Sequence, residues 1–262
     1  MAFTFTQSER AAQKVLFECG LQDPTEVGLR KLILGRKAFY DEQPMTGKDG
    51  DIVSYSNRSI ITVNSRIAFD TRKRFAAAHE LGHYEMHRYL RPVFGDTEYD
   101  LLNWYRGGPH EIEANEFAAE LLMPTEVFHS ECKSKGKLEP KLIDHLANRF
   151  QVSKTSAILK FVKRGNYPSM AVFCKDNKMK WWKKSEDFYN FLDFTRDSPP
   201  PPTTVAAEIF SGKKAYTGDA AKQDIWKSDW FEMKSNEQDS RFFEYCMVIQ
   251  SYNSTLSLIW GK

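Results

Sequence analysis

The chain has 262 residues, 41% of them hydrophobic, which is enough for one large domain or two small ones with apolar cores. A formal net charge of only +2 argues against uniform attraction to nucleic acid. The four cysteines are too widely scattered to indicate a zinc ribbon or a disulfide framework. The sequence shows no long apolar run and no basic N-terminal segment followed by an apolar one, so we expect a cytoplasmic protein with no membrane partner.

The first quarter of the chain predicts two helices followed by strands. Thr6 and Glu9 have the spacing of a capping box, and apolar side chains then recur at helical intervals until Gly20. Residues 24–34 are expected to form a second helix. Three strands are expected at 38–40, 51–55 and 59–64, the last two paired as a hairpin.

The strongest chemical signal is the segment 79–83, which is His-Glu-Leu-Gly-His. Positions four residues apart share one face of a helix, so His79 and His83 can bind one metal ion while Glu80 holds a water molecule beside it. Gly82 is costly inside a helix, and we expect it to mark a close approach by another backbone. Two histidines at this spacing can also bind nothing, and that alternative stays open on this motif alone.

A catalytic zinc ion usually has three protein ligands, so a third must come from elsewhere. His87 lies about 12 Å along the helix axis from His79, which is too far for it to bind the same ion as both earlier histidines. We therefore expect it to pack in the core or to contact a metal-ligating side chain. Tyr99, Tyr105 and His87 are candidates for stabilising the oxyanion of a tetrahedral intermediate, but the sequence does not fix where they point.

The next predicted helix offers two carboxylates. On its helical wheel Glu111 lies in line with Asn115 on the apolar face, whereas Glu113 shares a stripe with Glu116 and Glu120 that we expect to be solvated. A carboxylate on an apolar face needs a partner, so Glu111 is the better third metal ligand, and Asn115 can hydrogen-bond a ligating imidazole. The alternative is a partly exposed helix end, where an acidic side chain suits the helix dipole.

Together these segments resemble the ImmA/IrrE family of metallo-endopeptidases. The resemblance is carried by residues 79–83 and by the later run Glu-x-x-Ala-Asn-x-Phe-Ala-Ala-x-Leu-Leu-Met-Pro at 111–124. It also includes Ile-Ile-Thr-Val-Asn at 60–64 and covers about residues 35–165.

The resemblance implies a gluzincin-like zinc peptidase core with one Zn²⁺ per chain, held by His79, His83 and Glu111, with Glu80 as the catalytic base. Manganese is an alternative, because a site with two histidines and one glutamate tolerates several metals. Members of the family cleave helix-turn-helix repressors, which implies a repressor as the protein substrate and the release of stress, mobile-element or phage-defence genes. A general scavenging peptidase is a further alternative.

In zinc peptidases of this build, a strand ahead of the active-site helix can pair with an extended substrate. The predicted hairpin at 51–64 is a candidate for that role, and an ordinary place within the sheet is the equal alternative.

Residues 138–162 have a helix, turn, helix pattern, and the stretch 133–164 has nine Lys or Arg against two acidic residues. We favour a helical pair that buttresses the peptidase, with DNA contact as the less favoured alternative. A different class of protein is therefore also considered, namely a DNA-binding regulator with a structural or idle metal site. Lys154 and Lys160 would then contribute to DNA affinity.

From residue 166 the composition favours strands, which we expect at 170–174, 179–182, 206–210, 242–250 and 255–260. A short helix is expected at 187–194 and a stiff proline spacer at 198–202. The predicted fold is α+β, with a zinc peptidase domain (1–130), a helix-turn-helix-like segment packed on it (131–165) and a β-rich sensor or regulatory domain (166–262).

Overall fold

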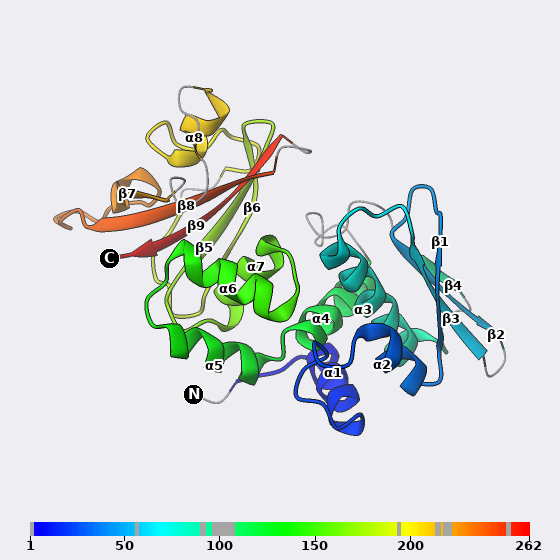
Figure 1. The fold of residues 1–262 in the computed structure, drawn as a ribbon. Helices are drawn as coiled ribbons and strands as arrows, with labels where there is room; N and C mark the ends of the chain where they lie inside the picture. The colour runs from blue at the N-terminus through cyan, green and yellow to red at the C-terminus, as the bar shows by residue number, and fades with distance from the viewer. Residues whose placement is uncertain are drawn as a thin grey trace. The chain divides into compact units, whose positions relative to one another are not determined.

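The computed structural model describes residues 3–55, 58–89, 93–95, 108–192, 195–212, 216, 222–249 and 253–262 (Figure 1). The described residues form eight α-helices and two β-sheets, which confirms the predicted α+β class. The chain divides into two compact units, one of residues 1–128 with 147–153 and one of residues 129–146 with 154–262. None of the described helices has the length and apolar composition needed to cross a lipid bilayer.

The first unit begins with the two predicted helices. Helix α1 has the predicted capping box, in which Glu9 N donates to Thr6 Oγ1 (3.2 Å) and Thr6 N donates to Glu9 Oε2 (2.9 Å). The second predicted helix starts later than expected, because residues 24–27 form a turn and Gly28 has a positive φ of 78°. The bounds are α1 Gln7–Glu18 and α2 Leu29–Gly35.

A four-stranded sheet and two long helices complete this unit. The strand order is β1-β3-β2-β4, with β1 parallel to β3 and the other pairs antiparallel. Helix α3 contacts β2, β3 and α4, and α4 also contacts α1. The bounds are β1 Phe39–Gln43, β2 Gly50–Tyr55, β3 Arg58–Asn64, α3 Asp70–His87, β4 Val93–Gly95 and α4 Pro109–Leu122.

The hairpin of β2 and β3 lies inside the sheet. Its side chains alternate as a half-buried sheet requires, since Ile52 and Ile61 are buried while Val53 and Ile60 are exposed. Strand β3 is paired on both sides from Ile60 to Val63, and β2 is paired with β4 from Asp51 to Val53 as well as with β3. This pairing favours the alternative of an ordinary place within the sheet, and pairing of the hairpin with an extended substrate stays a prediction.

Helices α5, α6 and α7 follow, and the helix-turn-helix pattern is confirmed as α6 and α7. Residue Gln151, in the turn between them, has a positive φ of 53°. Helix α7 packs on β5 and β6 of the second unit, which buries most of one side of it. Lys160 is only 4% exposed, so its proposed contact with DNA is wrong. The bounds are α5 Thr125–Lys135, α6 Pro140–Phe150 and α7 Lys154–Arg164.

The second unit contains a five-stranded antiparallel sheet of order β6-β5-β9-β8-β7. Four of the five strands were predicted, and the missed one, β7, is a polar edge strand with one buried residue. The bounds are β5 Met170–Lys175, β6 Lys178–Lys184, β7 Lys222–Trp226, β8 Arg241–Ile249 and β9 Ser254–Gly261, with the 3-10 helix η2 at Lys227–Asp229. The domain boundaries expected from the sequence stay a prediction.

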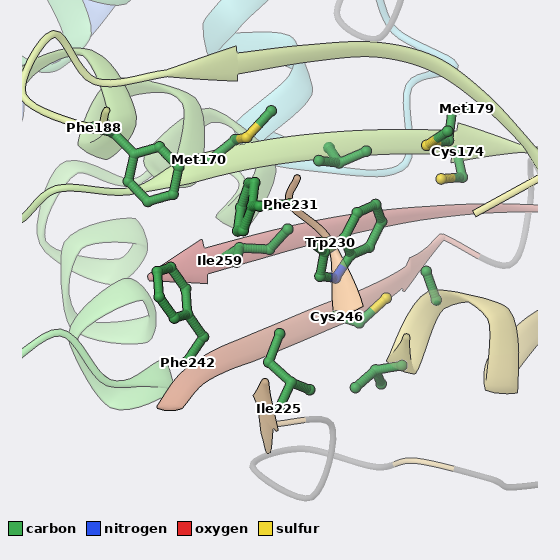
Figure 2. Close-up of a cluster of buried hydrophobic side chains, with 13 residues drawn as sticks. Met170, Cys174, Met179, Phe188, Ile225, Trp230, Phe231, Phe242, Cys246 and Ile259 are labelled. Carbon is green, nitrogen blue, oxygen red and sulfur yellow. The ribbon is translucent and has the colours of Figure 1, made fainter. Parts of the chain in front are cut away.

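Two predicted elements of this unit are wrong. Residues 206–210 are part of a helix, α8 (Val205–Phe210), rather than a strand. Residues 187–192 form no helix, and the last two residues of that predicted helix, 193 and 194, lie outside the described residues. Phe188 instead packs into the core cluster shown in Figure 2, together with Phe231 and Phe242.

A buried carboxylate fixes α8 to the sheet. Glu244 on β8 is 0% exposed and accepts four hydrogen bonds. Two come from the first backbone N–H groups of α8, at Val205 (2.9 Å) and Ala206 (3.1 Å). The others come from Trp230 Nε1 (2.9 Å) and Ser257 Oγ (2.6 Å). The carboxylate thus satisfies donors from a helix, a loop and a neighbouring strand.

Glu244→Ala should destabilise the protein by at least about 3 kcal/mol, because it leaves four buried donors without their acceptor. Urea unfolding followed by tryptophan fluorescence measures the loss. Ser257→Ala is the matched control, since it removes one donor and should cost about 1 kcal/mol. Equal losses in the two variants would contradict the role given to the carboxylate.

Candidate metal centre

Helix α3 presents the His-Glu-Leu-Gly-His segment inside the first unit. The run Ala76–Ala78 before it consists of the strongest helix former. His79 and Glu80 are fully buried, and His83 is 1% exposed. The two imidazoles lie on one face of the helix, as their spacing of four residues predicts.

Helix α4 supplies the third side chain from its first turn. Pro109 occupies the first helical position, where its fixed φ favours the start of a helix. Glu111 follows it in that turn, and its side chain is 27% exposed. The carboxylate therefore enters the site from the open end of α4 rather than from its buried middle.

Gly82 lets α3 and α4 approach one another closely. A Cβ atom at this position would lie 3.1 Å from Cδ1 and 3.2 Å from Cβ of Phe117, which is fully buried on α4. The close approach predicted at Gly82 is present, but an aromatic side chain makes it rather than a backbone. A methyl group here would force the two helices or the ring to move.

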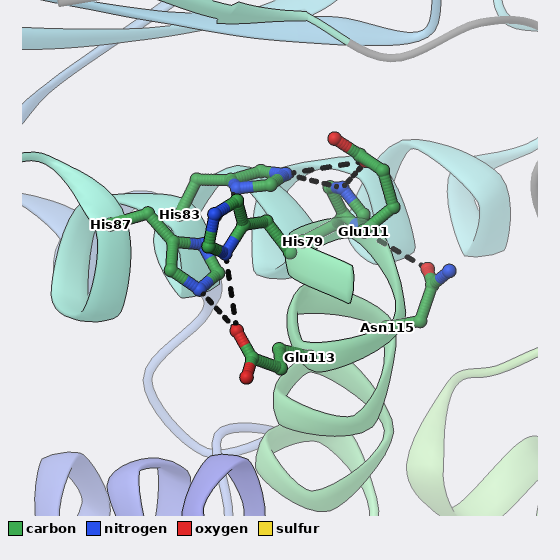
Figure 3. A network of polar contacts seen from close by, with 7 residues as sticks. His79, His83, His87, Glu111, Glu113 and Asn115 are labelled. Atoms are coloured by element: carbon green, nitrogen blue, oxygen red, sulfur yellow. Dashed lines mark hydrogen bonds and ion pairs between the residues drawn. The ribbon is translucent and has the colours of Figure 1, made fainter. Parts of the chain in front are cut away.

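Three potential ligand atoms converge between the two helices (Figure 3). His79 Nε2 lies 2.9 Å from His83 Nε2 and 3.1 Å from Glu111 Oε2, and His83 Nε2 lies 3.4 Å from the same oxygen. Zinc binds nitrogen and oxygen at about 2.0–2.2 Å, so ligand atoms around it lie about 3.3 Å apart. Two nitrogens and one carboxylate oxygen at these separations fit a zinc ion or a similar metal.

Asn115 lies behind one of the imidazoles, as predicted. Its Oδ1 atom is 2.9 Å from His79 Nδ1. An amide oxygen only accepts, so His79 Nδ1 carries the proton and donates. Nε2 of the same ring then keeps its lone pair directed at Glu111 and His83, which is the form that binds a metal.

A second line of contacts holds the other imidazole. His83 Nδ1 is 3.0 Å from His87 Nδ1, and His87 Nε2 is 2.8 Å from Glu113 Oε2. The carboxylate accepts from His87 Nε2, so His87 Nδ1 accepts from His83 Nδ1, and His83 Nε2 keeps its lone pair. His87 therefore contacts a candidate ligand, one of the two roles expected, and its engaged nitrogens argue against a role as oxyanion donor. Tyr99 and Tyr105 lie outside the described residues.

Burial favours the neutral form of these rings. Loss of hydration lowers the pKa of His83 to about 4, although Glu111 acts in the opposite direction. Burial also lowers the pKa of His87. A neutral imidazole is the form that ligates a metal, so the site does not need to release a proton from His83 near neutral pH.

The solvated stripe expected on α4 is wrong for Glu120. This side chain is 1% exposed and accepts from Gln13 Nε2 (2.8 Å), Thr125 N (3.1 Å) and Thr125 Oγ1 (2.6 Å). Glu113 is half-exposed but is committed to His87. The helical wheel could not show that α1 and the start of α5 cover this stripe.

Glu80 lies on the sheet side of α3 and is packed against the start of β2. A Cβ atom at Gly50 would lie 3.0 Å from Glu80 Cγ and 3.1 Å from its Oε1, with Thr62 O at 3.2 Å. A side chain at position 50 would therefore crowd the Glu80 carboxylate, whereas glycine does not. The contact between Gly50 and Glu80 was not predicted from the sequence, because the residues around Gly50 carry no signal of a helix thirty residues later.

Comparisons with known proteins point to a peptidase family. Residues 41–161 match the family model of the peptidase family described as the IrrE N-terminal-like domain. Among solved structures, a Mycobacterium tuberculosis transcriptional regulator is similar over 98% of this chain and 77% of its own, with a TM-score of 0.64 and 14% sequence identity. At that identity the likeness shows the fold alone. A search of curated proteins found no match.

The family match covers both α3 and α4, and thus all the residues that converge in Figure 3. Such a family implies a bound metal ion and a protein substrate. Residues 41–161 of the chain are therefore similar to the IrrE N-terminal-like domain of a peptidase family.

Proposed function

We propose that the protein is a zinc-dependent endopeptidase that cleaves and inactivates a helix-turn-helix transcriptional repressor. The observation that carries the peptidase part is the convergence of His79 Nε2, His83 Nε2 and Glu111 Oε2 on one point. Three protein ligands leave a coordination position for water or substrate, as catalytic zinc sites require.

The proposed mechanism assigns each side chain a separate task. When bound, zinc polarises a peptide carbonyl and makes a neighbouring water more acidic. His79, His83 and Glu111 hold the ion, while Asn115 and His87 keep the two imidazoles in the ligating tautomer. Glu80 accepts the proton of the attacking water and passes it to the leaving amine.

The burial of Glu80 supports its role as the base. Its carboxylate is shielded from bulk water and is held between α3 and the start of β2. A base in a fixed position needs no reorientation before it accepts a proton, and its basicity is not weakened by bulk solvation.

The repressor as substrate is supported by the sequence resemblance and by the match to an IrrE N-terminal-like domain. The structural neighbour is itself described as a transcriptional regulator, which agrees with a role in gene control. The alternative, a DNA-binding regulator with an idle metal, is less favoured because α7 is packed on the sheet of its own unit and Lys160 is buried.

Glu111→Gln should lower zinc affinity by at least about 100-fold, because it replaces a charged ligand with a neutral amide. Competition with a chromophoric chelator measures the affinity. Glu116→Gln makes the same chemical change on the same helix outside the converging atoms, and it should bind zinc as the wild type does. Unchanged affinity in Glu111→Gln would remove this residue from the site.

Glu80→Gln should bind zinc normally and cleave about 10²–10⁴-fold more slowly, because the amide cannot accept the proton of the attacking water. The substrate is the helix-turn-helix repressor encoded beside the gene, with cleavage followed on gels and metal content measured by mass spectrometry. The control is Glu85→Gln, since Glu85 is on the same helix and pairs with Arg36 (2.8 Å). An active Glu80→Gln enzyme would reject the mechanism. Equal cleavage of unrelated unfolded proteins by the wild type would reject only the choice of substrate.

Gly50→Ala should lower kcat while leaving zinc affinity unchanged, because the new methyl group would displace the Glu80 carboxylate without touching the ligands. Steady-state kinetics and a zinc titration on the same preparation separate the two effects. Gly35→Ala is the control, since Gly35 has an ordinary φ and nothing within 4 Å of its Cβ position. Full activity in Gly50→Ala would show that the position of Glu80 tolerates the shift.

A further inference from the structure

A second set of three ligand atoms lies beside the candidate metal centre. His87 Nε2, His110 Nδ1 and Glu113 Oε2 all lie within 4.8 Å of one another. Glu113 Oε2 is 2.8 Å from His87 Nε2 and 3.4 Å from His110 Nδ1, and the two imidazole rings have centroids 4.5 Å apart. The set repeats the composition of the first, with two nitrogens and one carboxylate oxygen from α3 and α4.

The two sets differ in their access to solvent. In the first, both imidazoles are buried, whereas in the second only His87 is buried. The side chains of His110 and Glu113 are 37% and 45% exposed. Water can therefore supply the remaining ligands of an ion held there, and the exposed side chains can adjust to it.

We propose that His87, His110 and Glu113 form a second, weaker site for a transition metal such as zinc, and that an ion bound there weakens metal binding at the first site. The donor types suit zinc, since imidazole and carboxylate are both ligands that it accepts. The binding part of this inference stands on these three residues alone. Its effect on cleavage rests on the proposed peptidase function.

The coupling between the sites follows from one proton position. His83 Nδ1 and His87 Nδ1 are 3.0 Å apart, and only one of the two nitrogens can carry the proton that joins them. An ion on His83 Nε2 requires that proton on His83 Nδ1. An ion on His87 Nε2 moves the proton of the neutral His87 ring from Nε2 to Nδ1, where it faces the proton on His83. Filling both sites therefore replaces a hydrogen bond with two opposed donors.

The conflict between the two protons makes the two sites antagonistic. By linkage, each ion lowers the affinity for the other by the same factor. The second site should thus bind zinc more tightly when the first is disabled, and excess zinc should reduce cleavage by the wild-type protein.

The test is a zinc titration of the metal-free, full-length protein in four forms: wild type, Glu111→Gln, Glu111→Gln with His110→Ala, and Glu111→Gln with His145→Ala. Glu111→Gln should retain a zinc site that the added His110→Ala weakens by about tenfold or more. The matched control removes another half-exposed imidazole paired with a carboxylate, since His145 Nε2 is 3.0 Å from Glu131 Oε2, and it should change nothing. Circular dichroism checks that each variant is folded.

Three results decide the inference. Equal zinc affinity with and without His110 in the Glu111→Gln protein would overturn the second site. A second zinc ion that binds wild type as tightly as it binds Glu111→Gln would overturn the coupling. In a separate cleavage assay of wild type and the single variant His110→Ala, inhibition by excess zinc, taken relative to each protein's own activity at low zinc, should need at least about tenfold more zinc in the variant. Equal sensitivity would overturn the link between the second site and cleavage. If no form cleaves any substrate, the proposed function falls, while the titrations still judge the second site.

Discussion

The candidate site depends on the close packing of α3 against α4. Gly82 and Phe117 meet so closely that a Cβ atom on the glycine would lie 3.1 Å from the Phe117 ring and would require it to shift. This contact sets the separation of the two helices, and the separation in turn places the Glu111 carboxylate next to two imidazoles from α3. Because interiors are densely packed, even one additional methyl group at the crossing would be transmitted to the ligand atoms. The spacing of the motif places the two histidines on one face of α3, and the close packing at Gly82 allows α4 to place Glu111 next to them.

Hydrogen bonds around the site fix one tautomer for each of the two candidate imidazole ligands, His79 and His83. Asn115 accepts from His79 and, through His87, Glu113 determines the proton on His83. If the rings were only buried, the proton of each neutral imidazole could be on either Nδ1 or Nε2. The hydrogen bonds of the two Nδ1 atoms keep the protons there, so both Nε2 lone pairs are available at the point where the candidate ligand atoms converge. A metal ion then meets a site that needs little rearrangement.

The sequence was informative where a local pattern reports a local structure. The capping box of Thr6 and Glu9, the hairpin strands and the helices of the peptidase motif are all determined by residues close in the chain. The wheel of α4 separated Glu111 from Glu113 for the same reason. The structure places Glu111 with the two histidines, and the role of Glu111 as a metal ligand remains a prediction.

Sequence reasoning failed at α8 and at contacts between residues that are far apart in the chain. Residues 206–210 were expected to form a strand, yet they lie in helix α8, and Ala206, Ala207 and Glu208 are themselves good helix formers. Thr204 caps it, with Ala207 N donating to Thr204 Oγ1 (3.2 Å), and Glu244 on β8 accepts from its first N–H groups. The buried carboxylate from β8 thus adds to a local helix signal that the strand prediction overlooked.

The failure at Gly50 and that at Glu120 have the same origin. Gly50 is small because Glu80 occupies the space beside it, and Glu120 is buried because α1 and the start of α5 cover it. Neither neighbour can be inferred from a helical period or a turn pattern.

The half-exposed Glu113 explains how a buried polar chain can exist here. A carboxylate buried without solvent would carry a high desolvation cost, and His87 is too deeply buried to end the chain itself. By placing the charge at the surface and linking it inward through His87, the fold puts a negative group in contact with the site at low cost. The same exposure leaves that carboxylate open to competing cations. Because Glu113 orients His83 from the surface, that orientation is sensitive to whatever binds at the surface. The two candidate sets of metal ligands therefore form one connected system.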